Sequence, residues 1–408
     1  MKRIARTIAS LAVLLSPAAA QTSASTKPTP TLLPPGPLHT AGSQIVDKAG
    51  KAVRLACVGL YDANFRISMQ VQARIMVAAG FNCIRMSWVN ATKEKDLATI
   101  DRVIAAVADT GLRLILDNHT NEAGTPADGY GAQQKNGLWY DVGGLSDSTN
   151  GAGVPGTVTD RKFLADWVTV ARHYAGNDIV IGFDLRNEPL HYRGQCTWGD
   201  GNIDSDIRLM YQRVGNAIQE VDVAKLIIAE GPQNWKSSFA DLGPAPEGDL
   251  TLAKSKPVVL NTPNKVVYSV HEYPNYHPNS GPVAIARMNY VWGYLISQNI
   301  APVWIGEMGA SLDGNVDAGE NLSSQRAWIT TLLPYLNGHE GMRGGPTFTE
   351  GQQAIGTDWW AWGNFEGDSP DGTLENDWST LRPGQAAAYS QLRQIVEPEL
   401  PVGLPPGH

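Results

Sequence analysis

Eight short apolar segments recur along the chain, and they limit the folds open to it more than any other feature. Each is dense enough in Val, Ile, Leu and aromatic residues for a strand that is covered on both faces. Most of them end in polar or aromatic residues, which is typical of strands that lead into a functional edge. The predicted strands are 55–60, 82–86, 112–117, 180–186, 226–230, 266–270, 302–306 and 357–362.

Helical patterns lie between several of these strands, and the alternation predicts an α/β fold with a parallel sheet. Eight strands favour a closed (β/α)8 TIM barrel. A doubly wound open sheet would show the same alternation, but no glycine-rich phosphate loop follows the first strand. The clearest helical patterns are 68–79, 93–109, 160–174, 205–221 and 323–336.

Two further segments complete the predicted barrel. Residues 42–55 alternate around a turn, which predicts a short N-terminal hairpin before the first core strand. The connection from Thr120 to Thr159 is long and rich in Gly, Asp, Asn and Ser. Loops of this length are usually functional, so we expect it to shape a cleft at the rim of the barrel.

The N-terminus is typical of an exported protein. Residues 1–20 combine basic residues, a short apolar core and small residues, as in a secretory signal peptide. Residues 21–40 are rich in Thr, Ser and Pro and read as a solvated leader, which leaves 41–400 as one folded domain. No later stretch reaches the roughly 18 to 20 apolar residues of a membrane span. We therefore expect a secreted or periplasmic protein.

The composition limits the classes of molecule that the protein is expected to bind. The net charge of −8 and the absence of a long basic run argue against nucleic acid. Aromatic residues with a polar edge predominate, since 12 Trp and 13 Tyr accompany only 7 Phe, and such residues suit sugar rings. The odd cysteine count leaves at least one free thiol. Cys57 and Cys83 lie in apolar strands and read as small buried hydrophobes rather than a bridge, and the His and Cys spacing does not resemble a zinc site.

Two glutamates at strand ends carry the chemical argument. Glu188 follows Asn187 and precedes Pro189, directly after the fourth predicted strand, and Glu307 ends the seventh. A pair of carboxylates can cleave a glycosidic bond when one gives a proton and the other stays ionised. A gap of roughly 5 to 5.5 Å would favour a retaining mechanism and roughly 6.5 to 9.5 Å an inverting one. The sequence leaves that distance open.

Other strand ends complete an ordered set of polar and aromatic residues. The set consists of Arg85, His119, Asn187, Glu188, His271, Tyr273, Glu307 and Trp360. In this order it resembles glycoside hydrolase family 5, the former cellulase family A. The segments VVLNTPNKVVYSVHEY (258–273), WGYLISQNIAPVWIGEMG (292–309) and EGDSPDGTLENDW (366–378) look closest to the secreted bacterial endo-β-1,4-glucanases of that family.

The resemblance implies a role for each matching residue. Glu188 would be the acid/base, Glu307 the nucleophile, and Asn187 would hold the sugar 2-hydroxyl. Tyr273 would donate a hydrogen bond to the nucleophile, and Arg85 would stabilise the ionised form of Glu307 through its fixed charge.

Three more residues follow from the same comparison. His119 and His271 would orient substrate hydroxyls and the acid. Trp360 would form the floor of the cleavage subsite.

The remaining aromatic and acidic residues near strand ends are judged from position alone. Alternation along a strand would turn Trp360 and Trp362 to the same side, so both are candidates for substrate contact. Trp360 is favoured, and Trp362 is either a neighbouring subsite or deeper packing. Trp235, beyond Glu230 in AEGPQNW, is a candidate stacking platform. Glu230 has no catalytic counterpart in the family, and alternation turns Glu272 away from its two neighbours.

These observations together predict a retaining endo-β-1,4-glucanase that cleaves internal bonds of cellulose or related β-glucans. A β-mannanase, a xyloglucan-acting enzyme or another β-glycanase on the same scaffold stays open. A non-catalytic polysaccharide-binding relative is disfavoured by the intact glutamate pair. We expect a monomer that needs no cofactor and no metal, with a β-linked polysaccharide as its partner.

Overall fold

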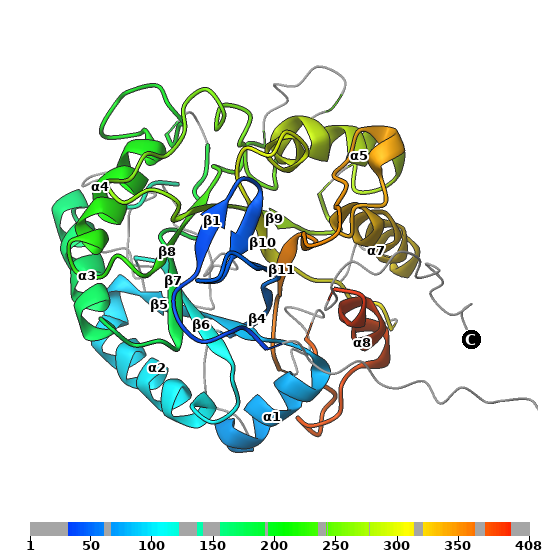
Figure 1. Cartoon of the computed structure of the whole chain (residues 1–408), viewed down its shortest axis with the longest axis horizontal. Coiled ribbons are helices and arrows are strands. Elements are labelled where there is room, and N and C mark those ends of the chain that lie inside the picture. The colour runs from blue at the N-terminus through cyan, green and yellow to red at the C-terminus, as the bar shows by residue number, and fades with distance from the viewer. Residues whose placement is uncertain are drawn as a thin grey trace, which may run out of the picture.

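Eight parallel strands close into a barrel at the centre of the molecule, and this confirms the predicted (β/α)8 architecture (Figure 1). The computed structural model describes residues 32–60, 67–121, 137–141, 156–191, 195–235, 242, 244–276, 278–313, 321–363 and 372–392. The strands adjoin one another in the order β10-β11-β4-β5-β6-β7-β8-β9. Their bounds are β4 Ala56–Leu60, β5 Cys83–Val89, β6 Arg113–Thr120, β7 Val180–Asp184, β8 Leu226–Glu230, β9 Val266–Glu272, β10 Val303–Met308 and β11 Gly356–Trp359.

Helices surround the barrel, as the ring of coiled ribbons in Figure 1 shows. Several of them begin at a polar residue whose side chain accepts a backbone N–H of the first turn, which stabilises a helix start. Ser68, Thr159, Asp206 and Asn321 act in this way. The helices are α1 Met69–Ala79, α2 Lys93–Val107, α3 Asp160–His173, α4 Ile207–Gln219, α5 Gly281–Met288, α6 Tyr294–Ser297, α7 Leu322–Leu336 and α8 Pro383–Ser390, and a π-helix at Asn289–Gly293 joins α5 to α6.

Two apolar cores hold the layers together. The larger one lies between the strands and the helices, and the smaller one fills the barrel interior. Above this inner core the strand side chains become polar, because Arg85, Asp117 and His271 follow on the same strands. The inner core therefore supports a polar site at the carboxyl ends of the strands.

A small N-terminal sheet closes the barrel at the amino ends of its strands. It consists of β1 His39–Ala41, β2 Gln44–Val46 and β3 Ala52–Val53, and Figure 1 shows it in blue across the centre of the ring. Leu33, Leu38 and Ile45 are buried in the inner core. The predicted leader therefore does not extend to residue 40, because the chain packs against the barrel from Leu33 onward.

The prediction for two of the cysteines is wrong. Cys57 on β4 and Cys83 on β5 form a disulfide inside the barrel, and Cys196 is the free, buried cysteine. The two bridged residues are direct register partners of adjacent parallel strands. Their pairing arises only when the barrel forms, so their separation of 26 residues gives no hint of it.

Some expectations fall on segments that are not described. The predicted signal peptide lies within residues 1–31, and most of the connection between Thr120 and Thr159 lies within 122–136 and 142–155, outside the described residues. Within the described part of the chain, every helix is too short or too polar to cross a membrane.

Candidate active site

Glu188 lies just beyond the end of β7 in an unusual backbone conformation. Its φ angle is 40°, in the left-handed region that residues with a side chain seldom adopt. The backbone N–H of Glu188 donates a hydrogen bond to Oε2 of Glu230 at 2.8 Å. The residue as a whole is only 8% exposed. Contacts with neighbouring strands therefore fix the position of this carboxylate.

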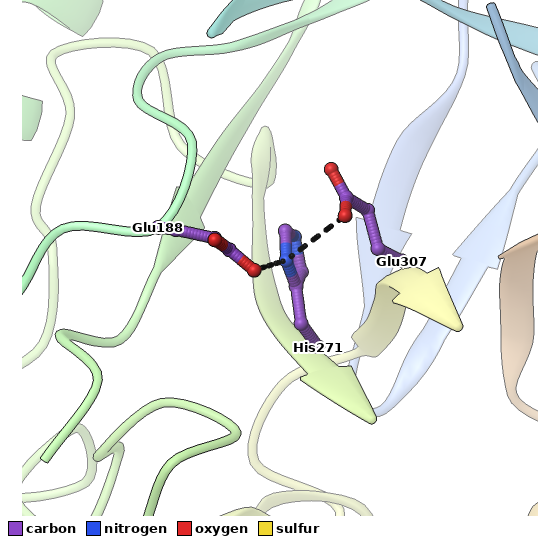
Figure 2. Close-up of side chains that lie close together, drawn as sticks. All are labelled: Glu188, His271 and Glu307. Atoms are coloured by element: carbon purple, nitrogen blue, oxygen red, sulfur yellow. Dashed lines mark hydrogen bonds and ion pairs between the residues drawn. The ribbon is translucent and has the colours of Figure 1, made fainter. Parts of the chain in front are cut away.

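Glu307 lies on β10, and each of its carboxylate oxygens accepts a strong donor. Arg85 Nη1 contacts Oε1 at 2.5 Å, and the hydroxyl of Tyr273 donates to Oε2 at 2.8 Å. One oxygen of Glu307 and one of Glu188 lie within 4.8 Å of each other (Figure 2). This separation is close to the spacing of roughly 5 to 5.5 Å found in retaining glycosidases.

His271 on β9 lies between the two carboxylates, as Figure 2 shows. Its Nδ1 is 2.9 Å from Oε1 of Glu188 and 3.6 Å from Oε2 of Glu307. Burial alone would lower the pKa of His271, but Glu230 and these two glutamates outweigh burial and raise the pKa to about 10. The ring is therefore an imidazolium at neutral pH, and it offsets the repulsion between two close carboxylates.

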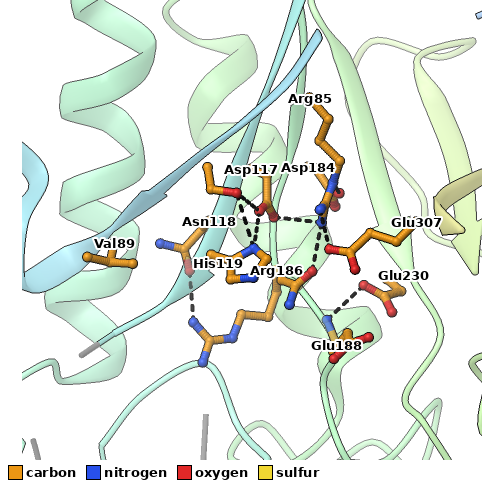
Figure 3. Close-up of polar contacts among 12 residues, drawn as sticks. Arg85, Val89, Asp117, Asn118, His119, Asp184, Arg186, Glu188, Glu230 and Glu307 are labelled. Atoms are coloured by element: carbon orange, nitrogen blue, oxygen red, sulfur yellow. Dashed lines mark hydrogen bonds and ion pairs between the residues drawn. The ribbon is translucent and has the colours of Figure 1, made fainter. Parts of the chain in front are cut away.

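Arg85 connects the nucleophile candidate to the strands behind it. The guanidinium is fully buried and uses three nitrogens, with Nε on Asp184 at 2.9 Å and Nη2 on both Asn187 at 2.8 Å and Asp117 at 2.9 Å (Figure 3). Burial opposes its charge, yet the surrounding carboxylates raise the pKa of Arg85. Its planar fork can bind several oxygens at fixed angles, which a lysine cannot do.

Asn187 is held by this arginine. Its side-chain oxygen accepts from Arg85, and its backbone N–H donates to the carbonyl of Asn118 at 3.0 Å. The amide orientation is therefore fixed, with the oxygen toward Arg85. An amide NH2 can donate to a sugar hydroxyl, as the role predicted for Asn187 requires.

His119 and Trp360 form one wall beside this network. Asp117 Oδ2 lies 2.6 Å from Nδ1 of His119, and the imidazole stacks on the indole of Trp360 with centroids 5.4 Å apart and planes at 13°. Gly59 on β4 makes room for that indole, because a Cβ there would lie 2.4 Å from Cε3 of Trp360. The position of Trp360 thus depends on the absence of a side chain at Gly59.

Trp235 is the outermost of three aromatic side chains in contact with one another. The innermost, Tyr273, donates its hydrogen bond to Glu307. The ring of Tyr273 contacts Tyr276 edge-on at 5.8 Å, and Tyr276 contacts Trp235 edge-on at 5.5 Å. Trp235 is 49% exposed. This series gives the site an exposed aromatic surface, as expected for a stacking platform.

Trp362 does not join these residues, so the prediction that it faces the same side as Trp360 is wrong. It is buried between the barrel and the helices, donates to Oε1 of Gln72 at 2.7 Å and packs edge-on against Phe81. The strand ends at Trp359, so the two-residue alternation does not extend to Trp362.

Several buried carboxyl groups around the site were not predicted as part of it. Asp117 could have been found, because alternation turns it to the same side as His119. Burial raises the pKa of Asp184 to about 6, with Arg85 opposing the rise. Asp358, whose two oxygens have no hydrogen-bond partner among the described residues, has its pKa raised far more, chiefly by burial. Glu230 is fully buried and contacts Glu188.

The side chains of Glu188, His271 and Glu307 are close enough together to hold a cation. One potential ligand atom from each of Glu188, His271 and Glu307 lies within 4.8 Å of the others. A metal would require a neutral imidazole. The raised pKa of His271 opposes this, because a proton must leave before a metal can bind.

Comparison with known proteins supplies the family. The sequence profile described as Cellulase (glycosyl hydrolase family 5) matches residues 46–366. The chain belongs to glycosyl hydrolase family 5. An endoglucanase of Paenibacillus polymyxa is 30% identical over 405 residues, which cover 90% of this chain and 89% of that protein. The major extracellular endoglucanase of Xanthomonas campestris is 27% identical over 83% of this chain and 67% of that protein.

Solved structures agree with the barrel. A hyperthermophilic endocellulase from the archaeon Pyrococcus horikoshii superposes with a TM-score of 0.66 at 22% identity, over 90% of this chain and all of that one. Membership of family 5 confirms the resemblance drawn from the sequence and makes the chain a glycoside hydrolase.

Proposed function

We propose that this family 5 enzyme is a retaining endo-β-1,4-glucanase that cleaves internal bonds of cellulose or related β-glucans. The observation that carries the proposal is the placement of Glu188 and Glu307, with one oxygen of each within 4.8 Å. The endoglucanases of Paenibacillus polymyxa and Xanthomonas campestris support the substrate class.

In the first step Glu307 attacks the anomeric carbon while Glu188 gives its proton to the departing glycosidic oxygen. Arg85 and Tyr273 hold both oxygens of Glu307, so the carboxylate is aimed before substrate arrives. The product of this step is a glycosyl-enzyme ester on Glu307 and a released chain end.

In the second step Glu188, now a carboxylate, takes a proton from water as the water attacks the same carbon. The ester breaks, Glu307 is regenerated, and the anomeric configuration is retained. Nδ1 of His271, 2.9 Å from Oε1 of Glu188, helps to hold that carboxyl group in place through both steps.

Two variants test these roles. Glu307→Gln should abolish cleavage of natural glucan and of an activated aryl cellobioside alike. Glu188→Gln should spare formation of the glycosyl-enzyme from the activated substrate, whose leaving group needs little acid help. Equal loss on the activated substrate for both variants would contradict the assignment.

The polymer is tested by reducing-end release from glucan, mannan, xylan and xyloglucan. We expect cellulose derivatives or mixed-linkage glucan to be cleaved fastest, with retention shown by anomeric detection on cellooligosaccharides. A strong preference for mannan would overturn the choice of substrate.

We further propose that the enzyme is exported as a monomer after removal of residues 1–20. The signal-like N-terminus supports export, as does the Cys57–Cys83 disulfide, because disulfides persist in oxidising compartments. N-terminal sequencing of the protein from medium and periplasm tests the cleavage site and compartment, and light scattering tests the monomer. A mature N-terminus at Met1 would contradict export.

A further inference from the structure

Glu230, at the end of β8, contacts both parts of the acid/base machinery. Its Oε2 accepts the backbone N–H of Glu188 at 2.8 Å and lies 3.4 Å from Nε2 of His271. Figure 3 shows Glu230 beside Glu188 and on the far side of the site from Arg85. The side chain is fully buried, so it cannot contact solvent. The two-step reaction described above assigns no task to this carboxyl group.

The contact with Glu188 fixes the backbone of the acid/base. A residue with a side chain at a φ of 40° adopts a sparsely populated conformation, which persists only when its surroundings hold it. The hydrogen bond from Glu188 N–H to Glu230 is one such restraint. It links the end of β7 to the end of β8 at the position where the acid/base leaves the strand.

The contact with His271 is an ion pair at 3.4 Å, and among the described residues Nε2 of His271 has no hydrogen-bond partner. The ring faces Glu188 through Nδ1 and Glu230 through Nε2, so it lies between two carboxyl groups. Further charge faces it from Glu307 on β10 and Asp184 on β7. Burial raises the pKa of Glu230 well above its usual range, and the facing His271 and the N–H of Glu188 both oppose that rise. The acidic group of Glu230 in turn helps to raise the pKa of His271.

We propose that Glu230 is a positioning residue of the acid/base: it joins the Glu188 backbone and the His271 ring in one unit that serves proton transfer and not nucleophilic attack. The proposal rests on the proposed role of Glu188. It concerns a residue that does not touch the reacting atoms and acts only through its two neighbours.

Glu230→Gln is the sharpest variant, because the amide oxygen can still accept the N–H of Glu188 while the acidic group facing His271 is lost. Glu272→Gln is the matched control. Glu272 is also a buried glutamate at a strand end, but it accepts from Trp292 at 3.1 Å and faces Arg287 behind the barrel. Both variants replace a buried carboxyl with an amide of the same shape.

The first measurement compares kcat/KM on aryl cellobiosides with good and poor leaving groups. For Glu230→Gln we expect a loss of about tenfold or more with phenyl cellobioside, within the range of general acid catalysis. With 2,4-dinitrophenyl cellobioside we expect a loss of less than about threefold, because that leaving group needs little protonation. Azide should speed turnover of the good substrate by Glu230→Gln, since it attacks without a general base. In Glu272→Gln we expect kcat/KM to change by the same factor on both substrates.

The second measurement follows the ring nitrogens of His271 by NMR in protein labelled with 15N-histidine. The titration midpoint should fall by about one pH unit or more in Glu230→Gln, because one carboxylate neighbour is lost. It should stay unchanged in Glu272→Gln. This readout does not depend on activity and reports on the arrangement even where turnover is slow.

An equal loss on both aryl substrates, or no loss, together with an unchanged His271 titration would overturn the proposal. If wild-type enzyme cleaves glucan and Glu188→Gln behaves as an acid/base variant, that failure concerns Glu230 alone. If wild-type enzyme releases no sugar from any glucan, the proposed function fails, and the NMR titration still decides whether Glu230 controls the charge of His271.

Discussion

The Nδ1 nitrogen of His271 lies 2.9 Å from Oε1 of Glu188, so the acid/base candidate has a buried cation as its direct partner. A histidine in such a place usually loses its proton, because burial disfavours charge. Here the surrounding carboxylates reverse that tendency and raise the pKa to about 10. The charge of one imidazole therefore affects both the stability of the barrel and its catalytic properties.

Replacement of His271 should change how stability depends on pH. Because the pKa of His271 is raised above 6.5 on folding, its contribution is fully present below pH 6.5 and is lost as pH rises through about 10. We expect the stability gap between wild type and His271→Gln to narrow by about 2 to 5 kcal/mol between pH 6 and pH 10.5, at about 1.4 kcal/mol per pKa unit. Urea unfolding of both proteins at several pH values in this range measures the difference. A gap that stays constant across this pH range would contradict the prediction.

Arg85→Lys should damage activity and stability together. One ammonium cannot replace three nitrogens that reach Asp184, Asn187 and Glu307, so buried carboxylates lose their partner. We expect a loss of about 3 to 5 kcal/mol in the free energy of unfolding, as for broken buried ion pairs. We expect kcat to fall at least about 100-fold, since charge stabilisation at the site is lost.

Arg287→Lys is the control for Arg85→Lys. Arg287 pairs with Glu247 in the layer behind the barrel, and its guanidinium is equally buried. Its replacement should lower the unfolding free energy but leave kcat within about twofold, since it contacts no group at the reaction centre. Loss of kcat in this control would show that global destabilisation explains both results.

Gly59→Ala should act through Trp360. The new Cβ would lie 2.4 Å from Cε3 of the indole, so the ring must move from its stack on His119. We expect kcat/KM on cellotetraose to fall about tenfold in wild-type background and much less in Trp360→Ala, since contacting residues couple by about 0.5 to 3 kcal/mol. Additive losses in the double variant would contradict this explanation.

Removal of the disulfide should lower stability and leave chemistry intact. Cross-linking residues 26 apart restricts the unfolded chain, a contribution of about 3 kcal/mol. The variant with Cys57→Ala and Cys83→Ala should unfold at lower urea concentration and keep its kcat at 25 °C. Alkylation of the denatured wild type should modify Cys196 alone without reductant. Modification of all three thiols would exclude the bridge.

Trp235→Ala should weaken binding of long substrates selectively. The indole is half exposed and supported edge-on by Tyr276, so it offers a face for a sugar ring. We expect KM for cellohexaose to rise about fivefold, equivalent to about 1 kcal/mol of aromatic contact. KM for the shortest cleaved oligosaccharide should identify whether the platform lies within the minimal site. Tyr290→Ala, at an exposed aromatic beyond α5, is the control and should leave KM unchanged.

The fold could be predicted because each barrel strand is covered on both faces and therefore reads as an apolar run. β8 spans Leu226–Glu230 as predicted, and α1 ends at Ala79, where Gly80 adopts a left-handed conformation. The residues at the carboxyl ends of these strands meet because a parallel barrel places all such ends on one side. This is why Arg85 contacts both Asn187 and Glu307 across long stretches of sequence.

What the sequence could not predict depends on contacts between segments. Cys57 and Cys83 pair only because their strands become neighbours in register. Trp362 turns outward because the strand ends at Trp359, and the sequence pattern Trp-Trp-Ala-Trp does not show that end. Glu230 was judged by its lack of a catalytic counterpart, whereas its contacts with Glu188 and His271 arise from three different strands.

The N-terminal sheet, which closes the barrel at the amino ends of its strands, also limits how far the chain can be shortened from its N-terminus. Leu38 and Ile45 cover the inner core from below, and Ser43 hydrogen-bonds Asn299 across 256 positions of the chain. A truncation at residue 46, where the family profile begins, would leave the bottom of the barrel open to water. Anyone grafting this enzyme onto a binding module should therefore join the two chains upstream of Leu33, and treat the preceding segment as the linker.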